Sequence, residues 1–263
     1  MKAFIHHIVY EFRAGLRDRS QLLMNYLFPL VFFALMGGLM SGINPGFRAT
    51  LIPAMALFAL MCAFFLSYPA GMVAARDSGL LRSYRINGVP GWAAMIVPPL
   101  ANLLHMIMVT VIIAVAGRLA FRAALPSDWL RFAAVWLAAA AALSGLGAVI
   151  AAVASSSRAA VLISQLAYIP SIVLGGLMMP ASVLPGGLAR LARIFPASHA
   201  MSAFAGGPGS GRAVAILAAG ALLSYGVALS LYEWDPKSGR PAGRKLLGLL
   251  ALAPYAAAVL AGI

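Results

Sequence analysis

The lysine residues of this chain show whether it could bind ATP through a phosphate-binding loop. A phosphate-binding loop needs a lysine directly after glycine, so that its ammonium reaches the β- and γ-phosphates while backbone N–H groups cradle the rest. The chain has three lysines, Lys2, Lys237 and Lys245, and they follow methionine, proline and arginine. The chain therefore does not bind ATP through a loop of this kind.

Ion-coupled transport is the second possibility, because carboxylates inside apolar segments can relay protons or sodium ions across a membrane. All six acids lie at or beyond the ends of the long apolar runs: Glu11, Asp18, Asp77, Asp128, Glu233 and Asp235. This placement disfavours an ion-coupled carrier. Backbone sodium sites and His105 keep that alternative open.

Metal and nucleophilic chemistry have no support either. His6, His7, His105 and His199 show no metal-ligand spacing with acids or cysteines, and no serine can be combined with a histidine and an acid at one depth of an apolar segment. We therefore expect no catalytic residue, no metal site and no cofactor in this chain. His105, in the middle of an apolar run, is interpreted as a hydrogen-bonding group inside a helix bundle.

Composition places the chain among integral membrane proteins. Of its 263 residues 63% are hydrophobic and 10% are charged, which is more apolar surface than a soluble core can bury. The formal net charge is +13, and in a membrane protein such basic residues flank spans and meet anionic lipid. We therefore expect the lipid bilayer, and no nucleic acid, as the partner of this charge.

Charged residues divide the sequence into apolar runs of the roughly 20 residues that a helix needs to cross a bilayer. The runs are continuous rather than alternating, so they predict helices and not strands. The sequence thus predicts a single all-α transmembrane domain over 1–263, with six spans and a seventh at the C-terminus: about 20–42, 50–74, 92–117, 130–154, 159–178, 213–232 and 246–263.

Three segments between or before these spans differ from them. Residues 2–19 place apolar side chains at helical spacing among charged ones, which predicts an interfacial helix on the membrane surface. Region 180–212 holds two apolar pieces too short to cross, which predicts a re-entrant helical hairpin between the fifth and sixth spans. Residues 233–245 form a basic linker before the seventh span.

The basic segment 75–91 interrupts the apolar pattern between the second and third spans. A short amphipathic helix is predicted from Ser78 to Ile86, ended by Asn87, Gly88 and Pro90. With the N-terminus inside, twelve of the lysines and arginines fall on the cytoplasmic side and seven on the outer side. This bias predicts a cytoplasmic N-terminus and a cytoplasmic segment 75–91.

The order of these elements resembles the permease subunits of ATP-binding-cassette exporters of the second type, which include drug and polysaccharide export permeases. The likeness covers about residues 2–235. Two motifs carry it: an acid with Gly-hydrophobic-hydrophobic-Arg and a later proline in the first cytoplasmic loop, and a proline-rich helical hairpin after the fifth span. They match Asp77, Gly79, Leu80, Leu81, Arg82 and Pro90, and then Pro180, Leu184, Pro185, Leu188, Leu191, Phe195 and Pro196. Asp77 stands where the family commonly has glutamate, and the family's permeases usually end after the sixth span.

The resemblance implies that segment 75–91 carries the coupling helix, which seats in a groove of a separate ATPase subunit. The residues assigned to this contact are Asp77, Gly79, Leu80, Leu81, Arg82, Tyr84 and Arg85. ATP and magnesium would be bound by that partner subunit. The other interpretation of the segment is an ordinary basic loop that contacts lipid headgroups.

The sequence as a whole therefore predicts a permease of the bacterial plasma membrane that pairs with a second permease copy, identical or paralogous. It would export a lipophilic or amphipathic substrate, namely a drug, a lipid or a lipid-linked glycan. A substrate path is expected along the second and fifth spans, lined by Met61, Phe64, Phe65, Gln165, Tyr168 and Ser171. The competing hypotheses are an ion-coupled secondary carrier and a non-transport membrane scaffold.

Overall fold

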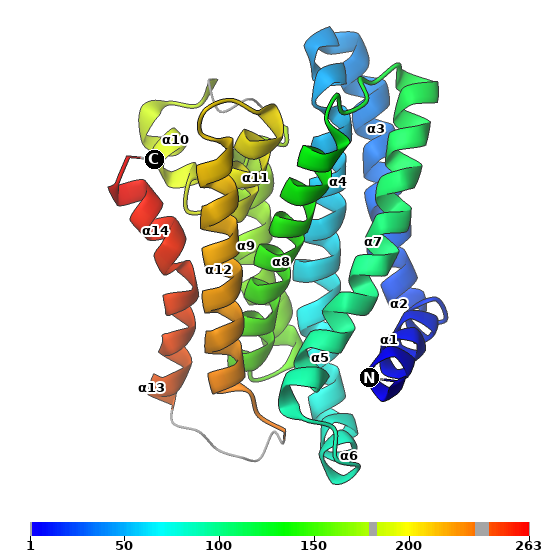
Figure 1. Cartoon of the computed structure of the whole chain (residues 1–263), viewed down its shortest axis with the longest axis vertical. Helices are drawn as coiled ribbons and strands as arrows, with labels where there is room; N and C mark the ends of the chain where they lie inside the picture. Colours follow the sequence, from blue (N-terminus) through cyan, green and yellow to red (C-terminus); the bar gives the residue numbers. More distant parts are fainter. Residues whose placement is uncertain (1, 179–182, 235–241, 263) are drawn as a thin grey trace.

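The computed structural model describes residues 2–178, 183–234 and 242–262, and within these ranges it is built from helices alone. Most of the long helices run along one common direction (Figure 1). Six helical runs among the described residues are long and apolar enough to cross a membrane: Arg19–Met40, Leu51–Asp77, Gly91–Phe121, Trp129–Val153, Ser157–Leu174 and Ser210–Leu231. The predicted all-α fold with six spans is thus confirmed.

Among the described residues, four of the spans are single helices and the other two are each interrupted by a short turn. The first span comprises α2 (Arg19–Leu22), η1 (Leu23–Leu27) and α3 (Phe28–Ile43), and the second comprises α4 (Leu51–Met61), η3 (Cys62–Ser67) and α5 (Tyr68–Asp77). The remaining spans are α7 (Gly91–Phe121), α8 (Trp129–Val153), α9 (Ser157–Leu174) and α12 (Ser210–Leu231). Shorter elements are α1 (Lys2–Gly15), η2 (Pro45–Ala49), α6 (Leu80–Ile86), α10 (Gly186–Ala192), α11 (Pro196–Ala205), α13 (Ala242–Lys245), η5 (Leu246–Leu252) and α14 (Ala253–Leu260).

Both interruptions, η1 and η3, are π-helical turns that precede a proline. Pro29 and Pro69 are the second residues of α3 and α5. A proline has no N–H to donate, and its ring crowds the carbonyl four residues earlier. The widened turns relieve this conflict, because the Phe28 N–H donates to the Leu23 carbonyl and the Tyr68 N–H to the Ala63 carbonyl, five residues back. The two turns pack against each other in the bundle.

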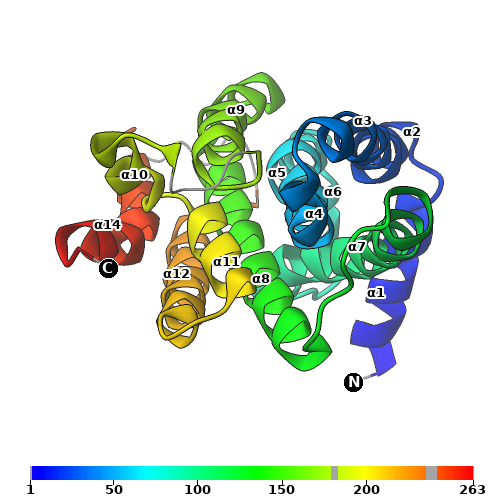
Figure 2. The ribbon, with the colours of Figure 1, turned by 90° about the horizontal axis from the view of Figure 1, so that it is seen from above.

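The second span forms the centre of the molecule. Every side chain from Ala54 to Phe65 is at most 1% exposed, because α7, α8 and α9 pack around this span. In the view along the bundle (Figure 2), α4 and α5 lie between α3 and α7 on one side and α8 and α9 on the other. The first and fifth spans instead keep outward apolar faces, which suits contact with lipid or with another membrane protein.

The N-terminal helix α1 lies against α7 and is fixed to the bundle by a polar and aromatic cluster. The Phe12 ring stacks on the His105 ring with centroids 4.4 Å apart, and His105 Nδ1 lies 2.6 Å from the Tyr26 hydroxyl. His105 is thus a hydrogen-bonding group inside the bundle, as predicted. The amide groups of Gln21 and Asn25 both donate to Asn102 Oδ1, at 2.7 and 2.9 Å.

The predicted surface helix 2–19 is divided in two. Helix α1 ends at Gly15, and Asp18 then caps the first span by accepting hydrogen bonds from the N–H groups of Ser20 and Gln21. An aspartate at this position stabilises a new helix start, so the chain turns here instead of continuing straight. The depth of α1 in a bilayer stays a prediction.

Two short helices, α10 and α11, follow the fifth span, where the hairpin was predicted. Helix α11 packs against α8 and α12, and α10 packs against α9. Residues 179–182, which include Pro180 of the hairpin motif, lie outside the described residues. Whether α10 and α11 enter the membrane and return stays a prediction.

The C-terminal segment runs beside α12 (Figure 1), which η5 and α14 both contact. Tyr255 of α14 is fully buried there, and its ring lies 5.8 Å from that of His199. A Cβ added at Gly220 of α12 would overlap the Tyr255 hydroxyl, so this glycine provides the notch that the tyrosine fills. A seventh crossing stays a prediction, and most of linker 233–245 lies outside the described residues.

Gly220→Leu is expected to push Tyr255 out of its notch and loosen the C-terminal segment, because overpacking at a close contact costs stability. The melting temperature of the detergent-solubilised chain should fall by about 5 °C. Gly226→Leu is the matched control on the same helix, since a Cβ at Gly226 meets no atom within 4 Å. Equal shifts in the two variants would contradict the proposed packing of Tyr255.

Candidate functional site

The loop between the second and third spans contains α6, which is shorter than predicted. Gly79 adopts a left-handed backbone with φ of 81°, which separates α5 from α6, so the helix begins at Leu80 and not at Ser78. A glycine takes this conformation without the steric cost that a side chain would add. At the other end the Asn87 side chain donates to the Ser83 carbonyl at 2.8 Å, and Pro90 precedes the start of α7.

The residues of α6 divide between an inward and an outward face. Leu81 is only 3% exposed and Tyr84 is half-buried, so both belong to the inward face. Leu80 is 44% exposed and Ile86 is 78% exposed. Arg82, Ser83 and Arg85, which lie between Leu80 and Ile86 in the sequence, are exposed as well. The predicted apolar anchor of Leu80, Leu81, Tyr84 and Ile86 is therefore split, and only Leu80 and Ile86 face outward.

Tyr84 joins α6 to α1. Its hydroxyl donates a hydrogen bond of 3.0 Å to Glu11 Oε1, and the same oxygen lies 3.5 Å from His7 Nε2. The His7 ring meets the Tyr84 ring edge-on, with centroids 5.2 Å apart. Burial and then the negative charge of Glu11 raise the pKa of Tyr84 above its ordinary value, so the hydroxyl keeps its proton. Helix α1 therefore flanks the loop that carries α6 and is bonded to it.

Arg76, just before the loop, joins it to the fourth span. This side chain is 6% exposed, and its Nη2 donates to the carbonyl of Ala154 at 2.7 Å. Ala154 caps the C-terminus of α8, where unpaired carbonyls carry partial negative charge and favour a cation. The Arg76 Nε lies 3.6 Å from Asp77 Oδ1, so the predicted coupling acid sits beside an arginine that is already bound to α8.

Sequence reasoning missed Arg76 and Glu11 as members of this site. Arg76 counted only toward orientation, although an arginine at the junction of an apolar run and a loop can cap a neighbouring helix. Glu11 is one of two acids near the surface helix and the one within it, which marks it as a candidate partner for a loop that holds three arginines and one tyrosine. Neither signal identifies the partner, because both contacts join segments distant in sequence.

The residues predicted for the substrate path lie on neighbouring spans. The Tyr168 hydroxyl of α9 is 3.7 Å from Cys62 Sγ of η3, so the second and fifth spans are side by side. Met61, Phe64 and Phe65 are at most 1% exposed and lie in the core, while Gln165 is half-buried. Ser171 donates to the Ala167 carbonyl at 2.6 Å within its own helix. Their role in a path stays a prediction.

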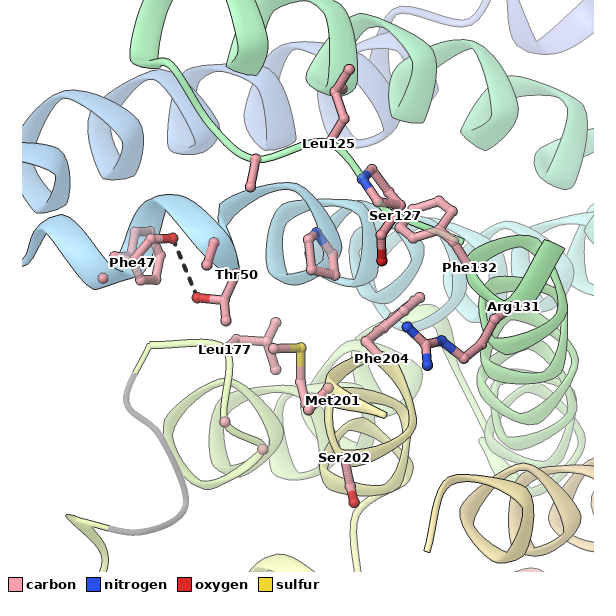
Figure 3. A pocket seen from close by; sticks show the side chains of 18 of the residues that line it. Phe47, Thr50, Leu125, Ser127, Arg131, Phe132, Leu177, Met201, Ser202 and Phe204 are labelled. Carbon is pink, nitrogen blue, oxygen red and sulfur yellow. Dashed lines mark hydrogen bonds between the residues drawn. The ribbon is translucent and has the colours of Figure 1, made fainter. Parts of the chain in front are cut away.

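A cavity of about 1000 Å³ (Figure 3) is lined by segments at the end of the bundle opposite to α6, whose place in the fold is seen in Figure 1. Four segments far apart in the sequence surround it: η2 with the start of α4, the loop 124–128 with the start of α8, the residues that follow α9, and helix α11. Phe47, Leu177, Met201 and Phe204 contribute apolar surface, and Asp128 and Arg131 carry charge. Sequence analysis predicted no site here.

The loop with α6 and the cavity can bind a partner or a ligand, and the hydrogen bonds of the loop connect it to neighbouring helices. Among the described residues, no group of three or more histidine, cysteine, aspartate or glutamate side chains could hold a metal ion. Five of the six acids are described, and they lie outside the spans or at their ends. What distinguishes the site is the short helix α6, which has exposed apolar side chains and is bonded to α1 through Tyr84, while Arg76 at the end of α5 bonds to the end of α8.

Comparison with known proteins agrees with this geometry. The family described as ABC-2 type transporter matches residues 3–207, which include α1, the loop with α6, the first five spans and α11. No curated protein matches the chain. Because the match covers well over half of the sequence, the chain belongs to the ABC-2 type transporter family and is a multi-pass permease component of an ABC transporter.

Proposed function

We propose that the chain is the membrane-spanning subunit of an ATP-driven exporter, which moves a lipophilic or amphipathic substrate such as a drug, a lipid or a lipid-linked glycan out of the cytoplasm. A separate ATPase subunit binds ATP and magnesium and supplies the work. The N-terminus and α6 face the cytoplasm, and the membrane is the bacterial plasma membrane. The excess of lysine and arginine on the α6 side supports this orientation.

The observation that carries the proposal is the outward face of α6. Leu80 and Ile86 are exposed although both are apolar, and Arg82 and Arg85, which lie between them in the sequence, are exposed as well. An apolar centre with a charged rim is the usual form of a protein-binding surface. Tyr84 and Arg76 fix the opposite side of this loop to the bundle, so a partner seated on α6 acts on an anchored element.

Leu80→Asp combined with Ile86→Asp is expected to lower the amount of ATPase that co-purifies with the chain by about tenfold or more, because a charge replaces each apolar contact. The measurement is a pull-down of a candidate ABC ATPase subunit that is co-expressed with the chain. Leu188→Asp on α10 is the matched control, since Leu188 is equally exposed at the other end of the bundle. Unchanged capture by the double variant would exclude α6 as the docking helix and would favour its contact with lipid headgroups.

Tyr84→Phe tests whether the bond to α1 transmits work. The ring still packs against His7, but the hydrogen bond to Glu11 is lost. We expect the ATPase to bind normally, and substrate-stimulated ATP hydrolysis in proteoliposomes to fall by roughly three- to tenfold. Tyr10→Phe, on an exposed tyrosine of α1, should change neither quantity. A normal stimulated rate in Tyr84→Phe would show that the bond is only structural.

A second permease copy, identical or paralogous, completes the proposed transporter. Helix α9 supports this, because it adjoins the central second span and yet presents a row of exposed apolar side chains: Val161, Leu162, Leu166, Ile169 and Val173. Such a row suits a helix–helix interface as well as lipid. An ion-coupled carrier or a scaffold would need neither the ATPase nor this pairing.

Leu166→Cys is expected to form a disulfide between two copies when membranes are oxidised, since Leu166 is 75% exposed on that row. Leu222→Cys on α12 is the control, because Leu222 is 78% exposed on a different helix. Cys62 is fully buried and should not react. The readout is dimer formation on a non-reducing gel. Cross-linking through Leu222→Cys alone would move the interface from α9 to α12.

A further inference from the structure

The cavity opposite to α6 carries a charge that the chain leaves uncompensated. Arg131 extends from the first turn of α8 toward Phe204 of α11, at the edge of the cavity (Figure 3). Its backbone N–H donates to Asp128 Oδ1 at 2.9 Å. Its guanidinium has no hydrogen-bond or ion-pair partner within residues 2–178, 183–234 and 242–262.

The position of Arg131 is set by its neighbours. A Cβ added at Gly206, just after α11, would lie 2.8 Å from Arg131 Nη1, so the glycine leaves the room that the guanidinium occupies. The Phe132 and Phe204 rings pack with centroids 5.2 Å apart and bring α8 and α11 together beside it. The fork of five N–H donors is therefore placed at the cavity without a protein acceptor.

The charge around this end of the bundle is strongly positive. Among the described residues, Asp128 is the one acid at this end, and its carboxylate caps α8, whose N-terminus already attracts negative charge. Seven arginines lie in the loops and helix ends of this side: Arg48, Arg118, Arg122, Arg131, Arg190, Arg193 and Arg212. A field of one sign over a cleft raises the local concentration of ions of the opposite sign.

The remaining wall of the cavity is mainly apolar, with polar side chains such as Thr50, Ser127 and Ser202 among the apolar ones. Phe47, Leu177 and Met201 line it from three different segments. Its volume lies at the upper end of the range for ligand sites that bury a small organic molecule. Trp129, which is half-exposed two residues before Arg131, is the type of side chain that marks the headgroup level of a bilayer.

From these observations we propose that the cavity binds an anionic phospholipid of the surrounding bilayer. The headgroup phosphate pairs with the Arg131 guanidinium, whose fork matches phosphate oxygens. The acyl chains lie against Phe47, Leu177 and Met201. This site goes beyond the proposed export function, because it requires neither an ATPase nor a transported substrate.

The test uses the full chain in detergent without an ATPase and measures binding of dioctanoyl phosphatidylglycerol and dioctanoyl phosphatidylcholine by native mass spectrometry. Phosphatidylglycerol should bind more tightly than phosphatidylcholine. Arg131→Gln should weaken the binding of phosphatidylglycerol by about tenfold, since a charged hydrogen bond is lost. Arg131→Lys should retain most of the affinity, because it keeps the charge.

Two further variants locate the site. Arg212→Gln removes a charge at the same end that does not line the cavity, and it should leave binding unchanged. Ser127→Trp places an indole in the cavity, which should weaken the binding of both lipids because it fills part of the space. Equal binding by Arg131→Gln and the native chain, or equal losses in Arg131→Gln and Arg212→Gln, would overturn the proposal. So would displacement of the lipid by an equal concentration of inorganic phosphate, which would identify a free anion as the ligand.

Discussion

Backbone polar groups inside a membrane have no water to bond with, and the whole structure follows from how the chain satisfies them. Helices satisfy most of them internally. Where Pro29 and Pro69 remove a donor, the π turns η1 and η3 shift the pairing by one residue so that neighbouring N–H groups still find carbonyls. At the end of α8, where carbonyls lose their helical partners, the buried side chain of Arg76 supplies a donor.

The same requirement explains why α6 is joined to both sides of the bundle. Arg76 caps α8 just before the loop, and Tyr84 within α6 bonds to Glu11 of α1. Helix α1 in turn stacks on α7 through Phe12 and His105. A seven-residue helix has few interactions of its own, and these three contacts hold it in place. A partner that binds its outward face would therefore contact an element that is connected, through these packed groups, to the first, third and fourth spans.

Sequence reasoning located the spans well because charged residues are excluded from hydrocarbon, and their gaps are visible without a structure. It did not find the hydrogen bond between Asn25 and Asn102, because the two residues are 77 positions apart in the sequence. The two faces of α6 were not separable, because in so short a helix Leu80 and Leu81 are equally apolar and only tertiary packing decides which is buried. The cavity at the far end is assembled from four separate segments, so no local pattern of residues could indicate it.

Burial of the second span constrains where a substrate could pass. Met61, Phe64 and Phe65 are enclosed by the chain's own helices, and exposing three such side chains to water would cost on the order of 5–9 kcal/mol. A path opened through the middle of one subunit would require this cost in every cycle. The outward face of α9 is already exposed and includes the half-buried amide of Gln165. A path between two copies along that face therefore disrupts far less packing, and it places the polar group of Gln165 where an amphipathic substrate would pass.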